Sequence, residues 1–220
     1  MFYTKILLAL HSLLDYISPP FCSACNIYLQ NRAIFCVNCE RRIVPIVSKT
    51  IAITATKQIK VFAISQYEYP IKRLILAKHG SNQIASQQLG ELLWEKTDIC
   101  NIQFDIIVPI PLHWTRYASR GFNQSDEIAK AIAKKSNKPT VQLLKRVRRT
   151  KFQAQLDPIG REKNVLEVFD FYQTNLVIKG KHILLVDDLL TTGATIKSAA
   201  KKLFQLHPAS ITIAVACRTS

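Results

Sequence analysis

The sequence predicts an α/β protein in which a central, mainly parallel sheet follows a small four-cysteine module. From residue 105 onward, short apolar runs alternate with helical patterns, which is typical of a doubly wound parallel sheet. Before them, two Cys-x-x-Cys pairs lie within residues 22–39 and indicate a metal-binding module. We therefore expect an N-terminal helix and zinc-binding module over residues 1–48 and an α/β domain over residues 49–220.

The N-terminal module begins with an amphipathic helix expected over residues 4–16, which Pro19-Pro20 ends. Its candidate metal ligands are Cys22, Cys25, Cys36 and Cys39. Two such pairs can give four thiolates to one tetrahedral Zn²⁺; the alternative, two disulfides, is disfavoured in a reducing cytoplasm. Four sulfurs leave no coordination position for water, so we expect a structural zinc that supplies folding energy. The two remaining cysteines, Cys100 and Cys217, are expected to be buried, inert thiols.

The other expected elements follow from apolar periodicity and from turn residues. Before the α/β core we expect a strand around Val61–Ile64 and helices over residues 70–78 and 83–96. In the core we expect strands over residues 105–109, 141–147, 168–172, 182–186 and 210–216, and helices over residues 122–136 and 195–205. Asp157-Pro158 is a further helix-start signal. Asn123 or Ser125 is the expected N-cap of the helix over residues 122–136.

The stretch Ile183–Thr195 combines a buried strand, two adjacent carboxylates and a small-residue turn that opens a helix. Asp187 and Asp188 are expected at the carboxyl end of the strand, where open α/β sheets bind ligands. They suit the vicinal hydroxyls of a ribose, or a Mg²⁺ ion beside them. The turn can present hydroxyls, backbone N–H groups and a helix dipole to a phosphate. Its residues are Thr191, Thr192, Gly193, Ala194 and Thr195.

A second unusual stretch, Val108–Gln124, also follows a strand, so its loop is expected near the first site. Two prolines stiffen the turn, and two arginines can bind phosphate oxygens bidentately. The expected phosphate-binding residues are Pro109, Ile110, Pro111, Leu112, Arg116 and Arg120. A rigid loop with exposed arginines is the alternative interpretation, and a lone loop histidine such as His113 is more often neither an acid nor a ligand.

The chain is strongly basic, with 30 Lys and Arg against 15 Asp and Glu and a formal net charge of +15. This charge indicates a polyanionic partner, nucleic acid first, although a solvated basic face is the alternative. Between Ile128 and Lys151 there is no acid, and the candidate nucleic-acid contacts there are Lys145, Arg146, Arg148, Arg149 and Lys151. The apolar run Ile6–Leu10 falls far short of the roughly 20 residues that a membrane span needs, and a cytoplasmic location is expected.

The Ile183–Thr195 stretch resembles the phosphoribosyl pyrophosphate (PRPP) motif of the type I phosphoribosyltransferases. Together with the four cysteines, the Val108–Gln124 block and the run from Arg148 to Val165, it is similar to the ComF family of competence-associated phosphoribosyltransferase-like proteins, of the ComFC/GntX type. The similarity covers nearly the whole chain, in the family's order. It implies a zinc module on a type I phosphoribosyltransferase fold, which binds PRPP with Mg²⁺ and handles imported single-stranded DNA in natural transformation.

Two functions stay open on the sequence alone. One is a PRPP-binding protein of DNA uptake whose basic surface contacts single-stranded DNA, with a competence helicase or other uptake proteins as partners and an association with the membrane through that machinery. The other is an active phosphoribosyltransferase of nucleotide metabolism, with Asp187 and Asp188 as its catalytic residues and an unknown acceptor. Thr191 stands where relatives acting on oxopurines carry a carboxylate, which argues against a hypoxanthine-type reaction.

Overall fold

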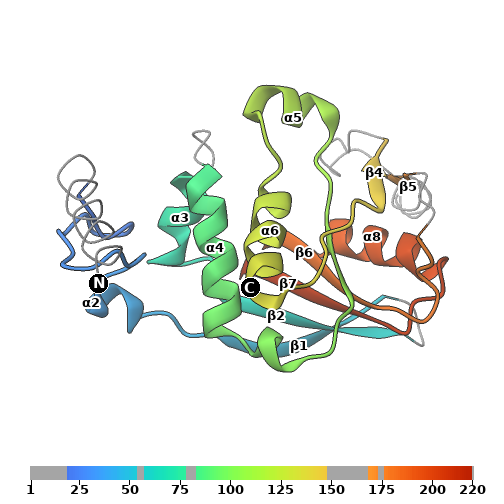
Figure 1. Ribbon diagram of the computed structural model, residues 1–220, viewed down its shortest axis with the longest axis horizontal. Helices are drawn as coiled ribbons and strands as arrows, with labels where there is room; N and C mark the ends of the chain where they lie inside the picture. Colours follow the sequence, from blue (N-terminus) through green and yellow to red (C-terminus); the bar gives the residue numbers. More distant parts are fainter. Residues whose placement is uncertain (1–18, 54–56, 78–82, 148–167, 173–175, 220) are drawn as a thin grey trace, which may run out of the picture.

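The structure is a computed structural model that describes residues 19–53, 57–77, 83–147, 168–172 and 176–219 (Figure 1). The expected helix over residues 4–16 and the helix start at Asp157-Pro158 lie outside the described residues. In chain order the elements are α2 (Val37–Glu40), β1 (Ile46–Ala52), β2 (Gln58–Gln66), α3 (Ile71–Ala77), α4 (Gln83–Lys96), the 3₁₀ helix η2 (Asp98–Asn101), β3 (Ile106–Pro109), α5 (Trp114–Arg120), α6 (Gln124–Ser136), β4 (Leu144–Arg146), β5 (Phe169–Phe171), β6 (His182–Leu190), α8 (Ala194–Phe204) and β7 (Ser210–Arg218).

A five-stranded sheet in the order β1-β2-β7-β6-β3 forms the centre of the protein. The pairs β2·β7, β7·β6 and β6·β3 are parallel, and only the edge pair β1·β2 is antiparallel. The predicted mainly parallel sheet is therefore confirmed, with β6 as an inner strand. Strand β1 was not expected, because its sequence of mixed polar and apolar residues gives a weak strand signal.

Side chains alternate between two cores on the opposite faces of the sheet. On β6, Leu184 and Val186 join the core under α3, α4 and α6, whereas Ile183 and Leu185 join the core under α8. All four are at most 1 % exposed. In Figure 1, α4 and α6 lie over one part of the sheet, and α8 lies near β4 and β5. A strand buried on both faces must be apolar at every position, which is why this run is so easily read from the sequence.

The cysteine module packs against the α/β domain. Its buried residues Leu29, Phe35 and Ile43 belong to the same core as Leu89 and Leu93 of α4. The predicted boundary between residues 48 and 49 falls inside β1, so the chain enters the sheet directly from the module.

Three expectations are corrected by the structure. The strands expected over residues 141–147 and 168–172 are the short β4 and β5, which pair antiparallel in a separate two-stranded sheet. The chain meets the central sheet just before β4, where Thr140 bridges to Ile107 of β3. The expected loop after β3 contains the helix α5. Cys217 is buried as expected, but Cys100 is exposed, because it lies on the outer side of the surface helix η2. Among the described residues, no helix has the length and apolar character needed to cross a membrane.

Candidate functional site

A cleft of about 230 Å³ opens where β3 ends, beside the last third of β6 and the helix α5. Its walls hold both carboxylates and both arginines that the sequence singled out: Asp187, Asp188, Arg116 and Arg120. Strands β3 and β6 are parallel neighbours, with Pro109 opposite Val186, so the chain segments that follow them emerge side by side. This is the edge at which parallel α/β sheets bind ligands.

The two carboxylates lie within β6, which continues past them to Leu190 instead of ending at Val186. Asp187 accepts hydrogen bonds at Oδ1 from the Ser125 hydroxyl and from the backbone N–H of Asp188, each at 2.9 Å. The Ser125 contact ties the carboxylate to the first turn of α6. The acid is thus held in one orientation at the cleft instead of rotating freely, which is what binding a fixed pair of hydroxyls or a hard cation requires.

The loop after β3 is fixed at its base by backbone contacts. The N–H of Ile110 donates to Val186 O at 2.9 Å, and Asn123 Nδ2 donates to Ile110 O at 3.0 Å. Asn123 occupies the N-cap position of α6 as predicted, but its side chain makes no capping bond and holds this loop instead. The loop is therefore a rigid base from which α5 projects.

Helix α5 places the two arginines over the cleft. His113 is its N-cap, with Nδ1 accepting from the Thr115 N–H at 3.3 Å, and Gly121 ends it in the left-handed region at φ 79°. A side chain with a Cβ is strained at that φ, so glycine suits the stop. Arg116 and Arg120 stand one turn apart on α5, so both reach the same cleft. His113 serves as the cap of α5.

A third arginine, Arg146 of β4, also lines the cleft. Burial lowers its pKa, the nearby Arg116 guanidinium lowers it further, and the Asp187 carboxylate opposes both effects. An arginine stays charged at neutral pH even so. Three cations from two elements therefore face one pair of carboxylates, an arrangement suited to a ligand with several phosphate charges and a sugar.

The predicted phosphate turn is divided between two hollows. Thr195 lines the cleft, whereas Thr191, Thr192 and Gly193 line a neighbouring hollow of about 330 Å³ with Lys197 and Arg218. Gly193 has a φ of 77° and is the N-cap of α8. The turn thus lies directly at the start of an eleven-residue helix, whose dipole favours an anion.

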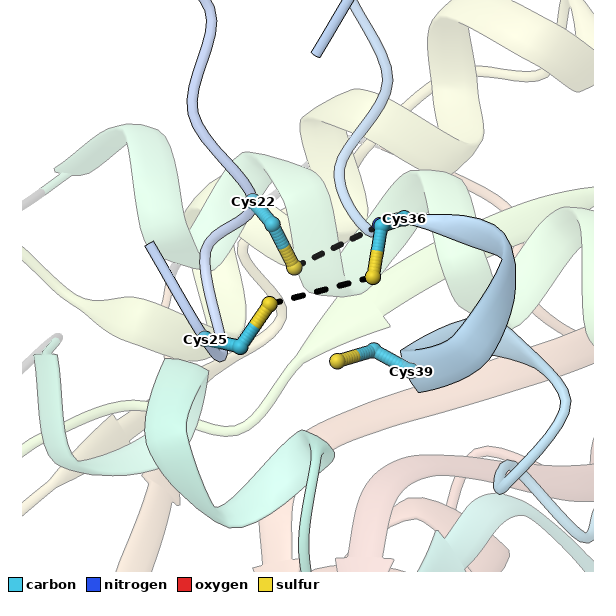
Figure 2. Close-up of side chains that lie close together, drawn as sticks. All are labelled: Cys22, Cys25, Cys36 and Cys39. Atoms are coloured by element: carbon cyan, nitrogen blue, oxygen red, sulfur yellow. Dashed lines mark hydrogen bonds between the residues drawn. The ribbon is translucent and has the colours of Figure 1, made fainter. Parts of the chain in front are cut away.

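The four cysteines of the module gather in one place (Figure 2). Their Sγ atoms all lie within 4.8 Å of one another, and Cys25 and Cys36 are 3.8 Å apart. A tetrahedron with Zn–S bonds of about 2.3 Å has edges of about 3.8 Å, so this spacing fits one metal ion. All four are free thiols, so the alternative of two disulfides is not what the structure contains.

Backbone hydrogen bonds favour the thiolate of Cys22, whereas burial raises the pKa of Cys39. Burial alone would raise the pKa of Cys22, but backbone N–H groups of Cys25, Cys36 and Ala24 outweigh it and lower that pKa to about 6. The N–H of Cys36 donates to the Cys22 Sγ at 3.3 Å. Such N–H···S contacts are typical of thiolates that bind metals, and the cluster can hold one.

Several residues of these sites were missed by sequence reasoning or given another role. The sequence indicates only a helix-cap role for Ser125 and only a nucleic-acid contact for Arg146. Lys197 and Arg218 lie near the phosphate turn without any local signal that would have paired them with it. Of the other predicted nucleic-acid contacts, Lys145 lies on β4 and is 43 % exposed, while Arg148, Arg149 and Lys151 lie outside the described residues.

Comparison with known proteins gives a consistent result. The phosphoribosyl transferase domain family matches residues 80–220. Competence protein F of Haemophilus influenzae is 27 % identical over 195 residues, which cover 85 % of this chain and 80 % of that protein. The DNA utilization protein YhgH of Escherichia coli is 32 % identical, over 52 % of this chain and 50 % of its own length. Competence protein ComFC of Bacillus subtilis is 33 % identical, over 46 % of this chain and 38 % of its own length.

Proposed function

The chain belongs to the phosphoribosyl transferase domain family and, within it, to the ComF family, and from this we propose that its cleft binds PRPP. One observation carries the proposal: two carboxylates of β6 face three arginines and Thr195 across a single cleft. The carboxylates suit the ribose hydroxyls and the arginines suit the pyrophosphate. The 5-phosphate is assigned to the turn Thr191–Thr195 at the start of α8.

Magnesium fits the same arrangement, because two half-buried carboxylates offer the hard oxygen ligands that this ion prefers. Asp187 and Asp188 would hold it, and when bound it would supply positive charge beside the pyrophosphate. Arg116, Arg120 and Arg146 bind and orient the pyrophosphate oxygens. Each well-placed donor of this kind contributes on the order of 3 kcal/mol when charge develops on a leaving group.

Calorimetric titration with PRPP, with and without Mg²⁺, tests this proposal. Wild-type protein is expected to bind saturably, and Asp187→Asn with Asp188→Asn is expected to abolish binding. The matched control is Glu95→Gln with Asp98→Asn, which removes the same charge from two exposed side chains away from the cleft. Wild-type protein that fails to bind at millimolar PRPP would overturn the proposal, and binding followed by turnover in an acceptor screen would establish the transferase alternative.

We further propose that the protein handles single-stranded DNA in DNA uptake, on the cytoplasmic side and beside a competence helicase or other uptake proteins. The net charge of +15 and the similarity to two competence proteins and a DNA utilization protein support this. Phosphate contacts make DNA binding fall steeply with salt. Affinity for an oligonucleotide should therefore drop steeply between about 50 and 200 mM salt, and a flat response would contradict it. The Asp187/Asp188 double variant should bind DNA as wild type does.

We also propose that the four cysteines hold a structural zinc ion. The spacing of the Sγ atoms, the N–H donors at Cys22 and the absence of a water position in a four-thiolate site support this assignment. Because the module shares its core with α4, the metal would stabilise the α/β domain as well as the module.

A further inference from the structure

Another concave surface, distinct from the hollow at the phosphate turn, lies beside the cleft and carries three large exposed aromatic rings. This hollow, of about 540 Å³, is lined by Trp114 and Tyr117 of α5 and by Tyr172 after β5. Their side chains are 71 %, 53 % and 50 % exposed, respectively. Single exposed apolar side chains are ordinary, but aromatic rings from two separate elements around one hollow indicate a binding surface. We call it the aromatic groove.

The rings rest on ordered parts of the chain. The ring of the buried His113 lies 5.7 Å from that of Trp114, centroid to centroid, and His113 is itself fixed as the cap of α5. The backbone N–H of Tyr172 donates to Leu143 O at 3.1 Å, which holds the end of β5 against the segment before β4. Because the backbone under the rings is ordered in advance, less conformational entropy is lost when a ligand binds.

The groove carries positive charge at one side. Lys145 and Arg146 of β4 line it, whereas Asp126 is the one acid among those lining residues that the structure describes. Asp126 already pairs with Lys130 at 2.8 Å and accepts from Gln142 at 2.7 Å. Lys145 pairs with Asp170 at 3.3 Å, but both side chains are about half exposed, and such a pair is weak and easily exchanged. A ligand with flat rings and anionic linkers complements this combination.

We propose that the aromatic groove binds single-stranded DNA, with bases stacked on Trp114, Tyr117 and Tyr172 and phosphates on Lys145 and Arg146. The inference rests on the proposed DNA-handling function and assigns it a site. Stacking on aromatic side chains is how proteins grip single strands without reading sequence, since every base has a π-face. Arg146 lines both the groove and the cleft, so the strand and a sugar phosphate would meet at this residue.

The test compares oligo(dT) with an abasic oligonucleotide of the same length, by fluorescence anisotropy on the full chain loaded with Zn²⁺. The abasic strand keeps the phosphates and removes the bases, so it isolates stacking. Wild-type protein is expected to bind oligo(dT) at least about 5- to 150-fold more tightly, the range given by stacking a single base. Trp114→Ala should weaken oligo(dT) binding by about fivefold or more and leave abasic binding unchanged.

Two matched variants keep this result interpretable. Tyr28→Ala removes an aromatic ring that is 58 % exposed on the cysteine module, and it should bind both strands as wild type does. Trp94→Phe leaves Trp114 as the single tryptophan, because the chain has two. The fluorescence of that variant should be quenched by oligo(dT) and not by the abasic strand. Calorimetry with PRPP should give the wild-type affinity for Trp114→Ala, which also shows that the variant is folded.

The outcomes separate the groove from the function on which it rests. If the wild type binds oligo(dT) and the abasic strand with equal affinity, the assignment of the aromatic groove as the DNA site is overturned. Salt-dependent DNA binding elsewhere on the surface would remain. No binding of either strand overturns both the groove and the proposed DNA handling. Tighter binding of oligo(rU) than of oligo(dT) overturns the assignment to DNA. Loss of affinity in Tyr28→Ala as large as that in Trp114→Ala places the contact on another surface and also overturns the groove.

Discussion

Arg146→Met is expected to weaken PRPP binding strongly, whereas Lys145→Met is expected to leave it nearly unchanged. Both substitutions remove one positive charge from β4, at adjacent positions. Arg146 lines the cleft with Arg116 and Arg120, and its surroundings lower its pKa through burial and the proximity of Arg116. Lys145 is 43 % exposed, pairs with Asp170 and does not line the cleft.

The magnitude follows from the kind of contact that is lost. A hydrogen bond to a charged group contributes about 1.5–3 kcal/mol, and an anionic ligand also relieves the repulsion between neighbouring guanidinium groups. The loss corresponds to about a 10- to 150-fold weaker affinity for PRPP. An exposed charge outside the cleft is screened, so we expect a change of less than about twofold for Lys145→Met. Methionine keeps most of the aliphatic volume of arginine but loses the guanidinium contact with the Phe169 ring, which lies 5.7 Å from Cζ.

Calorimetry with PRPP and Mg²⁺ measures both variants against wild type at one salt concentration. Thermal unfolding of each variant shows whether the fold is retained. Equal losses in the two variants would mean that the total charge matters and not the position of Arg146. An unchanged affinity in Arg146→Met would refute the reasoning, because removing a cation that contacts a phosphate must weaken the binding of that phosphate.

Two further predictions concern the frame of the site. Metal analysis should find about one zinc ion per chain. Chelation should lower the midpoint of thermal unfolding, because Leu29 and Phe35 of the cysteine module share a core with α4. A metal-free chain of full stability would contradict this. In Gly90→Ala, the added Cβ would meet Ala131 Cβ and Ile128 O at 2.6 Å each, where α4 packs on α6. We expect the free energy of unfolding in urea to fall by about 1–2 kcal/mol, after the higher helix propensity of alanine is taken into account. An unchanged midpoint would show that α4 and α6 can move apart to accept the extra methyl group without loss of stability.

Much of the site could be predicted because its signals are local. A buried parallel strand is apolar at every position, so the two acids within residues 183–190 are conspicuous against it. The strand, the turn and the helix that follows are contiguous in the chain, and the ComF resemblance that they support is confirmed by the family match and by the relatives. The predicted roles of Asp187, Asp188 and the turn residues stay predictions for the titration to test.

The residues that sequence reasoning missed are joined to the site only across long chain separations. Ser125 reaches Asp187 over 62 positions, and nothing in the sequence around Ser125 marks it as more than a helix cap. Arg146 stands in a basic run, which by itself indicates a nucleic-acid contact. Its position in the cleft depends on the pairing of β4 with β5, and strands of three residues carry little pattern of their own.

The sequence by itself determined the elements whose reasons lie within a few residues of each other. These are the central strands with their continuous apolar runs, the helix after the phosphate turn, and the two cysteine pairs whose spacing favours one metal. Only the tertiary structure decided which charges face one another. It brought the segments after β3 and β6 to the same edge, turned Arg146 into the cleft and set three aromatic rings around one groove. The physical reason is that hydrophobic periodicity specifies which face of an element is buried, whereas contacts between polar side chains depend on the packing of elements that are far apart in the chain.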